Sequence, residues 1–282
     1  MQETLKKAQI LIEALPYIRK FSSKIICIKY GGSAMENEAL KHCVMEDIAL
    51  LKLVGLKPII IHGGGKDISN FCEKLGIKSA FKQGLRVSDT ETTKLAEMVL
   101  YQINKGLVQH LQSLGVRAVG LCGKDGGLLH CTKKDANLGF VGTISGVDTA
   151  LLHALLERDY LPIIAPLGMD ENLNTYNINA DDVACALAKD LKAEKLVFLS
   201  DIAGLYADFE DENSLISRIT TSEAKALLPS LQGGMLIKLK SCIDACESGV
   251  KRVHILDGRV EHALLLEFFT DEGIGTLVVR DE

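Results

Sequence analysis

Short runs of apolar residues recur along the chain, and each is long enough for one β-strand. They lie at residues 25–29, 57–62, 117–122, 160–168, 195–201, 251–257 and 276–280. Their hydrophobicity is continuous rather than alternating, which is typical of strands that are covered on both faces. Longer segments with helical spacing of apolar residues fill the gaps, as at 91–115 and 181–193. This alternation predicts an α/β fold with an open, largely parallel sheet sandwiched between helices.

One segment interrupts the alternation. Residues 123–147 have no helical period and predict turns and a β-hairpin inserted between two units. The chain contains neither a low-complexity linker nor an internal repeat. We therefore expect two lobes that share one sheet rather than two independent domains.

The first 21 residues predict a helix that stands outside the alternating pattern. Its apolar residues at three- and four-residue spacing form one stripe: Leu5, Ala8, Ile12 and Leu15. Pro16 should kink or break this helix. Because the helix precedes the first strand, its stripe packs either on its own domain or on another subunit.

Composition narrows the class of protein. The 282 residues are 47% hydrophobic and 24% charged, which excludes a disordered chain. The net charge of -5, with no tract of Lys and Arg, provides no field for nucleic acid. No apolar segment approaches the roughly 20 residues of a membrane span, and the amino terminus lacks the features of a signal peptide. We expect a cytoplasmic protein that binds neither nucleic acid nor membrane.

Metal-binding patterns are missing from the sequence. The eight cysteines form no C-x-x-C pair, and several lie in apolar runs, where a thiol behaves as a small hydrophobic group. No paired carboxylates or His/Glu spacing suggest a site either. We expect reduced cysteines, no protein-held metal, and a core position for His62.

Glycine clusters follow several predicted strands and precede predicted helices. They comprise Gly31 and Gly32, then Gly63, Gly64 and Gly65, then the turn at 200–204. In open α/β sheets, ligands bind beyond the carboxyl ends of the strands, where helix N-termini favour phosphate. Neither a Walker loop nor a G-x-G-x-x-G fingerprint is present. The clusters indicate a polyphosphate site, although a tight strand-to-helix turn explains each of them equally well.

Two lysines lie where a phosphoryl group would be held. Lys29 ends a buried strand beside paired glycines, and a lysine in that position faces a ligand or a buried acid. Lys238 falls on the first turns of a helix opened by Gly233 and Gly234, and alone it would be a surface lysine. Together the two cations would neutralise one transferring phosphoryl group.

Polar groups that could complete such a site lie in NINADD at 177–182 and in QGLRVSD at 83–89. Asn179 or Asp181 would cap a helix that begins near residue 181. Alternatively, Asn177, Asn179 and Asp181 alternate along an extended segment and share one face, where Asp181 would hold both lysines. Arg86 presents a guanidinium suited to a carboxylate, with an ordinary ion pair as the alternative.

Taken together, these stretches resemble a known family. KYGGSAM, HGGG, GLRVSD, NINADD, LSDIAGLY, GGMLIK and EHALLLEFFT, in this order over almost the whole chain, are similar to the N-acetylglutamate kinases of the amino acid kinase superfamily. The resemblance implies ATP-dependent phosphorylation of the γ-carboxylate of N-acetyl-L-glutamate, the second step of arginine biosynthesis. It also implies an N-terminal helix at 1–22, an acetylglutamate-binding and dimerising lobe at 23–175, and an ATP-binding lobe at 176–282.

The resemblance further implies residue roles. Lys29 and Lys238 match lysines that stabilise the transferring group, and Asp181 matches the acid that organises them. The phosphate-binding loops contain Gly31, Gly32, Gly63 and Gly64. The implied acetylglutamate contacts are Gly64, Gly65, Arg86, Asn177 and Asn179, with Arg86 at the α-carboxylate. The implied nucleotide contacts are Ser200, Asp201, Gly204 and Tyr206, with Mg²⁺ held mainly by phosphate oxygens.

Two features are similar to the arginine-inhibited, hexameric branch of the family. They are the leading helix with Tyr17 and the segment at 261–276. This branch implies interlaced helices in a trimer of dimers, and a PII-type signalling protein as a further partner. The implied arginine contacts are Tyr17, Lys195, Glu261, His262 and Glu267.

Two departures and two alternatives remain. Gln83 stands where the family usually has Asn and Ser88 where it commonly has Thr, and both adjoin Arg86. One alternative function is that of another acyl-phosphate-forming amino acid kinase, which the order of GLRVSD and NINADD disfavours. The other is a catalytically silent arginine sensor, which has no reason to retain Lys29, Asp181 and Lys238.

Overall fold

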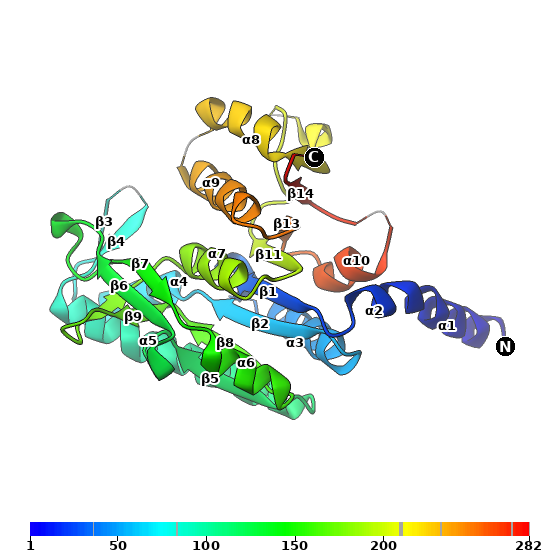
Figure 1. Ribbon diagram of the computed structural model, residues 1–282, viewed down its shortest axis with the longest axis horizontal. Coiled ribbons are helices and arrows are strands. Elements are labelled where there is room, and N and C mark those ends of the chain that lie inside the picture. The colour runs from blue at the N-terminus through cyan, green and yellow to red at the C-terminus, as the bar shows by residue number, and fades with distance from the viewer. Residues whose placement is uncertain (36, 83, 209–210, 232, 272, 282) are drawn as a thin grey trace.

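A computed structural model describes residues 1–35, 37–82, 84–208, 211–231, 233–271 and 273–281, so that Gln83 lies outside the described part. Its main sheet has the strand order β12-β14-β13-β11-β1-β2-β8-β5 (Figure 1). The strands are β1 Ile25–Tyr30, β2 Lys57–His62, β5 Ala118–Cys122, β8 Leu161–Ala165, β11 Lys195–Ser200, β12 Arg218–Thr220, β13 Val253–Asp257 and β14 Thr276–Val279. Neighbours pair in parallel, except that β14 runs antiparallel to β13. The predicted open, largely parallel sheet is confirmed.

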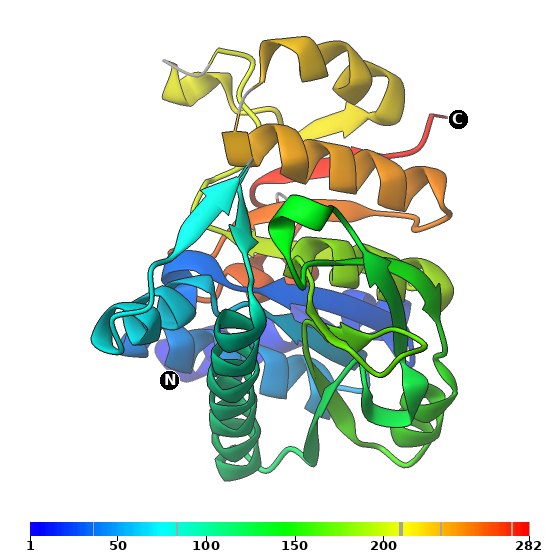
Figure 2. The same ribbon diagram turned by 90° about the vertical axis from the view of Figure 1, so that its left-hand side faces the viewer.

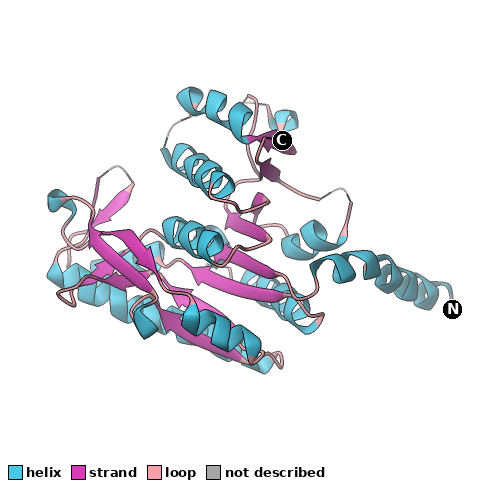
Figure 3. Ribbon diagram, viewed as in Figure 1, coloured by secondary structure: helices cyan, strands magenta, loops and turns pink. Residues whose placement is uncertain are grey.

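Helices cover both faces of this sheet (Figure 3). They are α3 Glu38–Leu53, α4 Gly65–Lys74, α5 Thr90–Ser113, α6 Ala150–Glu157, α7 Ala180–Asp190, α8 Thr221–Leu227, α9 Gly233–Glu247 and α10 Ala263–Phe269. On β1, Cys27 packs with the core under α6, α7 and α9, whereas Ile26 and Ile28 pack with the core under α3, α5 and α10. Because successive strand side chains point to opposite faces, both of which are buried, the strands had to be apolar throughout.

The run at 160–168 forms two strands instead of one. β8 ends at Ala165 and β9 begins at Leu167, with Pro166 between them, which has no N–H to continue a ladder. β9 leaves the main sheet for a four-stranded sheet of order β10-β9-β6-β7. The strands of that sheet are β6 Leu129–Lys133, β7 Gly142–Val147, β9 Leu167–Met169 and β10 Thr175–Asn177. The predicted hairpin within 123–147 is its antiparallel pair β6 and β7, and a further hairpin joins β3 Ala80–Lys82 to β4 Leu85–Val87.

The N-terminal segment forms two helices, α1 Gln2–Glu13 and α2 Leu15–Phe21, with Pro16 in the first turn of α2, as the predicted break required. α2 is anchored by the buried Phe21, whose ring meets Phe268 of α10 edge-on at 5.5 Å between centroids. α1 extends away from the body of the molecule, and its Ile10, Leu11 and Ile12 are exposed (Figure 1). The apolar side chains described on α1 therefore do not pack on their own domain. No helix in the described ranges is long and apolar enough to cross a membrane.

Candidate active site

The first two glycine loops lie side by side at the carboxyl ends of β1 and β2. Gly63 N–H donates to the Tyr30 carbonyl at 2.8 Å. The loop lies close to α5: a Cβ at Gly64 would lie 2.8 Å from Leu100 Cδ2 and from Ile103 Cδ1, so both side chains would have to shift. The backbone of this loop therefore packs closely against α5. The helix α4 begins directly after it, at Gly65.

Gly31, two residues after Lys29, leaves room for the lysine side chain. A Cβ at Gly31 would lie 3.1 Å from Lys29 Nζ, so glycine leaves room for the ammonium group to fold back over the loop. Gly32, which opens a short 3₁₀ turn at Gly32–Met35, has a φ of +74°, a left-handed conformation that favours glycine. The sequence KYGGSAM thus places one cation and an open backbone turn together.

The two predicted lysines meet on one carboxylate. Asp181 Oδ1 lies 3.0 Å from Lys29 Nζ, and Asp181 Oδ2 accepts from Lys238 Nζ at 3.2 Å. Lys29 approaches Oδ1 as an ion pair, and Oδ1 has no partner in hydrogen-bond geometry among the residues that the structure describes. Burial alone would raise the pKa of Asp181, but the charges of Lys29 and Lys238 outweigh it and hold the pKa below its usual value. Asp181 is therefore an anion that spaces two cations, not a base.

A cavity of about 970 Å³ opens over this group. The predicted site residues that line it are Lys29, Gly31, Gly32, Asn179, Asp181, Ser200, Asp201 and Lys238. Gly84, at the turn of the β3–β4 hairpin, also lines it, and a Cβ there would lie 3.5 Å from Ile237 Cδ1 of α9. Figure 2 shows the tip of this hairpin beside the start of α9. The cavity therefore lies between strand ends from the first part of the chain and the N-terminal turns of α7 and α9.

The NINADD segment is extended only as far as Asn179. Asn177 ends β10, Asn179 caps α7 by accepting from the Asp181 N–H at 2.8 Å, and Asp181 is already helical. The prediction that Asn177, Asn179 and Asp181 alternate along one extended segment is therefore wrong for Asp181, which lies in the helix. Capping by Asn179 starts the helix one residue earlier, and the first turn of α7 brings Asp181 to the lysines.

Arg86 lies on β4, next to the cavity but not among the residues that line it. Its guanidinium donates to the Gly65 carbonyl at 2.6 Å, to Ser69 Oγ at 2.6 Å and to Ser79 Oγ at 2.9 Å. No carboxylate pairs with it in the part of the chain that the structure describes. Burial lowers the pKa of Arg86, yet a guanidinium remains charged at neutral pH. An oriented, buried cation without an ionic partner suits an anionic ligand better than the ordinary ion pair.

The four residues expected at the nucleotide are placed differently. Ser200 ends β11 with its hydroxyl 3.3 Å from Asp201 Oδ1, and both line the cavity. Gly204 packs tightly beneath β14, where a Cβ would lie 2.4 Å from Thr276 Oγ1. Tyr206 forms an isolated antiparallel bridge with Leu215. Gly204 and Tyr206 therefore shape the loop that follows β11 and do not line the cavity.

Sequence reasoning did not identify Lys240, which lines the same cavity. Residues two apart on a helix do not share a face, so Lys240 did not suggest a partner for Lys238. Its position in GGMLIKLK was the available signal. His62, in contrast, is a core histidine: its Nδ1 lies 2.8 Å from the Gly63 carbonyl and its Nε2 3.1 Å from Asn104 Nδ2, and burial lowers its pKa to about 4.

Three of the residues implied for arginine lie together. Tyr17, Lys195 and Glu267 line a cavity of about 390 Å³ between α2, α10 and the sheet. Glu267 Oε1 lies 2.9 Å from both Lys195 Nζ and His254 Nδ1. Burial opposes its ionisation, but His254 and Lys195 lower the pKa of Glu267 to about 2. Neither Glu261 nor His262 is among the described residues that line this cavity, and His262 instead contacts Asp47.

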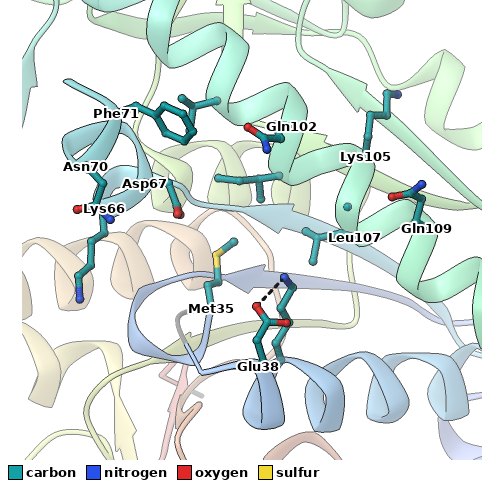
Figure 4. A pocket seen from close by; sticks show the side chains of 14 residues that line it. Met35, Glu38, Lys66, Asp67, Asn70, Phe71, Gln102, Lys105, Leu107 and Gln109 are labelled. Atoms are coloured by element: carbon teal, nitrogen blue, oxygen red, sulfur yellow. Dashed lines mark hydrogen bonds and ion pairs between the residues drawn. The ribbon is translucent and has the colours of Figure 1, made fainter. Parts of the chain in front are cut away.

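A further cavity of about 730 Å³ lies between α3, α4 and α5 (Figure 4). Lys41, Lys66 and Lys105 line it together with side chains that include Asp67, Gln102 and Gln109. Lys41 pairs with Glu38 at 3.4 Å, and Lys105 donates to the Gly120 carbonyl at 3.0 Å. None of the predicted site residues is among the described residues that line it.

Comparisons with known proteins identify the family. The family model described as "Amino acid kinase family" matches residues 24–257. The acetylglutamate kinase of Campylobacter jejuni strain RM1221 is 75% identical over 278 residues, which cover 99% of this chain and 100% of that protein. The acetylglutamate kinase of Caldanaerobacter subterraneus is 52% identical, over 99% of this chain and 95% of that protein.

Solved structures share the fold. The N-acetylglutamate synthase of Neisseria gonorrhoeae, complexed with coenzyme A and N-acetyl-glutamate, has a TM-score of 0.87 at 26% identity; 98% of this chain is covered but only 64% of that longer chain. Carbamate kinase from Giardia lamblia bound to AMP-PNP has a TM-score of 0.68 at 16% identity, over 92% of this chain and 99% of that one. The chain therefore belongs to the amino acid kinase family, among the acetylglutamate kinases.

Proposed function

We propose that this protein transfers the γ-phosphoryl group of ATP to the γ-carboxylate of N-acetyl-L-glutamate, giving N-acetylglutamyl 5-phosphate in the second step of arginine biosynthesis. The observation that carries the proposal is Asp181 between Lys29 and Lys238 on one cavity, in a chain that is 75% identical to an acetylglutamate kinase. The AMP-PNP bound to the similarly folded carbamate kinase supports ATP as the donor.

The chemistry needs cations more than a base. An oxygen of the substrate carboxylate attacks the γ-phosphorus, the bond from that phosphorus to the β–γ bridging oxygen breaks, and ADP leaves. The carboxylate is already the nucleophile, which fits an Asp181 that stays ionised between two lysines. The barrier arises from bringing two anions together, and Lys29 and Lys238 compensate the charge that develops on the transferring group.

We assign acetylglutamate to the first part of the chain, residues 23–175. Arg86 would bind its α-carboxylate through the guanidinium that Gly65, Ser69 and Ser79 already orient. The backbone of Gly64 and Gly65 and the side chains of Asn177 and Asn179 would complete this subsite. Because Arg86, on β4, is not among the described residues that line the cavity, substrate binding would bring the β3–β4 hairpin closer.

We assign the nucleotide, as its Mg²⁺ complex, to residues 176–282. Ser200 and Asp201 line the cavity beside Lys238, and Gly204 and Tyr206 shape the adjoining loop. Gly31 and Gly32 line the same cavity, and the turn at Gly63 lies beside Gly31. These turns would receive the phosphates. Mg²⁺ would be held mainly by phosphate oxygens.

We further propose feedback inhibition by arginine at the cavity of Tyr17, Lys195 and Glu267. Glu267 supplies the carboxylate that a guanidinium requires, and Lys195 supplies a cation for the α-carboxylate. An N-acetylglutamate synthase of similar fold, with 25% identity and a TM-score of 0.82, was solved with L-arginine, which supports the ligand class. Glu261 and His262 would contribute only if the segment that precedes α10 moved.

Assembly into a hexamer through interlaced α1 helices belongs to the same proposal. The exposed Ile10, Leu11 and Ile12 leave α1 with an apolar surface that another subunit would cover. A PII-type signalling protein is proposed as a regulator and the cytoplasm as the location. Light scattering of the full chain and of a variant that lacks residues 1–21 tests the assembly, and an equal number of subunits in the two particles would refute it.

The decisive experiment traps the acyl phosphate as its hydroxamate. The full chain is incubated with ATP and Mg²⁺ and with N-acetyl-L-glutamate, glutamate or aspartate, each with and without arginine. We expect product from the acetylated substrate alone, and no product when arginine is present. Lys238→Met should give no product. Lys94→Met, which alters an exposed lysine of α5, should give as much product as the wild type. Product from glutamate or aspartate would indicate another amino acid kinase, and no product from any substrate would favour a silent sensor.

A further inference from the structure

Three potential metal ligands from distant parts of the chain meet at the surface between α3 and α10. The Cys43 thiol, a Glu46 carboxylate oxygen and a ring nitrogen of His262 all lie within 4.8 Å of one another. Cys43 and Glu46 lie one turn apart on α3 and therefore share a face. His262 immediately precedes α10, which packs against α3 in the same hydrophobic core (Figure 1).

A buried carboxylate holds His262 in place. Asp47, one residue beyond Glu46, is fully buried, and its Oδ1 lies 2.6 Å from His262 Nδ1. Among the described residues, no group lies within hydrogen-bond geometry of its second oxygen, Oδ2. With Nδ1 engaged, Nε2 is the nitrogen left to bind an ion. A carboxylate on the far nitrogen of a histidine is the arrangement that orients the ligating histidine in many metal sites.

The charge of the neighbourhood favours a cation. Glu46 and Asp47 flank the thiol, and Glu261 is close enough to Cys43 to interact with it electrostatically. Glu46 is already in contact with the His42 ring, whose Nε2 lies 3.3 Å from Glu46 Oε1. The His42 ring stacks on His110 of α5, with its Nδ1 2.8 Å from His110 Nε2. The His42 Nε2 would have to release Glu46 when the ion binds.

We propose that Cys43, Glu46 and His262 bind a Zn²⁺-type ion, with water in the fourth position. Sulfur, nitrogen and oxygen ligands together suit zinc, whereas Mg²⁺ and Ca²⁺ prefer oxygen alone. On a bound ion the sulfur and nitrogen ligands would be roughly 3.5 Å apart, so small side-chain rotations close the present spacing. The ion would join α3 to the start of α10.

The test uses the full chain, free of any affinity tag, reduced and stripped of metal, in the absence of nucleotide. Co²⁺ is added as a spectroscopic probe. We expect one ion per chain, a thiolate-to-cobalt charge-transfer band in the near ultraviolet, and loss of the band when Zn²⁺ is added. Cys43→Ser should abolish the band. Cys185→Ser, which alters another partly exposed thiol outside the cluster, should retain it.

Two further variants separate ligation from orientation. His262→Gln should remove tight binding, whereas His153→Gln, which alters an exposed histidine of α6, should leave it unchanged. Asp47→Asn should keep the band but weaken Co²⁺ affinity by about 10–100-fold, because Asp47 acts through His262. Failure of the wild-type chain to bind Co²⁺, binding without a thiolate band, or a band that survives in Cys43→Ser would each overturn the proposal.

Discussion

Replacing Asp181 with asparagine tests the central contact of the proposed active site. The substitution keeps the size of the side chain but removes the negative charge between Lys29 and Lys238. The side chains of all three residues are largely buried, with exposures of 13%, 14% and 11% respectively. The two ammonium groups would then share a buried space with no counter-ion, so we expect both stability and turnover to fall.

The magnitude follows from the geometry. At 3.0 and 3.2 Å, each charge pair has a gross attraction of about 5 kcal/mol at an effective dielectric constant near 20. Desolvation offsets much of this attraction, and removal of one partner from a buried pair costs about 3–5 kcal/mol. Asparagine can still accept one hydrogen bond, so we expect a loss near the lower end, about 3 kcal/mol. That is a large fraction of the roughly 5–15 kcal/mol that stabilises a typical protein.

Urea unfolding at neutral pH and low salt measures this loss, with Asp182→Asn as the matched control. Asp182 lies on the same turn of α7, is more exposed, and pairs with Lys134 at 3.2 Å. Its loss should cost at most about 1 kcal/mol. AMP-PNP, whose phosphates replace the missing anion, should stabilise Asp181→Asn more than the wild type. Equal destabilisation by the two substitutions would refute the reasoning.

Three other substitutions extend the test. Gly31→Ala places a Cβ 3.1 Å from Lys29 Nζ and should lower kcat roughly 10–100-fold in a folded protein, whereas Gly106→Ala on α5, which meets nothing within 4 Å, should not; equal kcat values would contradict the role of Gly31. Arg86→Lys loses the fork that three groups orient and should raise the KM for acetylglutamate far more than it lowers kcat, as steady-state kinetics would show. Glu267 has a folded pKa of about 2 against an ordinary 4.5, so it contributes stability above pH 4.5 that is lost as the pH falls toward 2, up to about 3 kcal/mol. In urea unfolding across that window, the free energy of unfolding of Glu267→Gln should therefore fall less steeply with decreasing pH than that of the wild type. An equally steep fall in both proteins would refute this expectation. The same variant should lose inhibition by arginine.

Local pattern determined the secondary structure and the chemistry of single positions. The continuous apolar runs predicted the strands of the main sheet other than β12, because burial of both faces requires an apolar residue at nearly every position. The strand β12, Arg218–Thr220, has only its central residue buried and gave no such run. Lys29 beside Gly31 and Gly32 indicated a phosphate site, because a strand-end lysine next to glycine is costly without an anion. The ordered motifs predicted the family, which the relatives confirm.

Tertiary structure decided what local pattern leaves open. Strand order and the antiparallel direction of β14 depend on pairing between distant segments. The apolar run at 160–168 also divides at Pro166, because its second half pairs with strands of the smaller sheet. The sequence was compatible with Asn179 and Asp181 either as helix caps or as strand residues. The structure shows Asn179 as the cap of α7 and places Asp181, in the first turn, against Lys29 of β1 and Lys238 of α9. Lys240 had only its position in GGMLIKLK as a signal, and the meeting of Cys43 with His262 had no signature in the sequence. Contacts between residues far apart in the chain depend on packing of whole elements, which no spacing within one motif encodes.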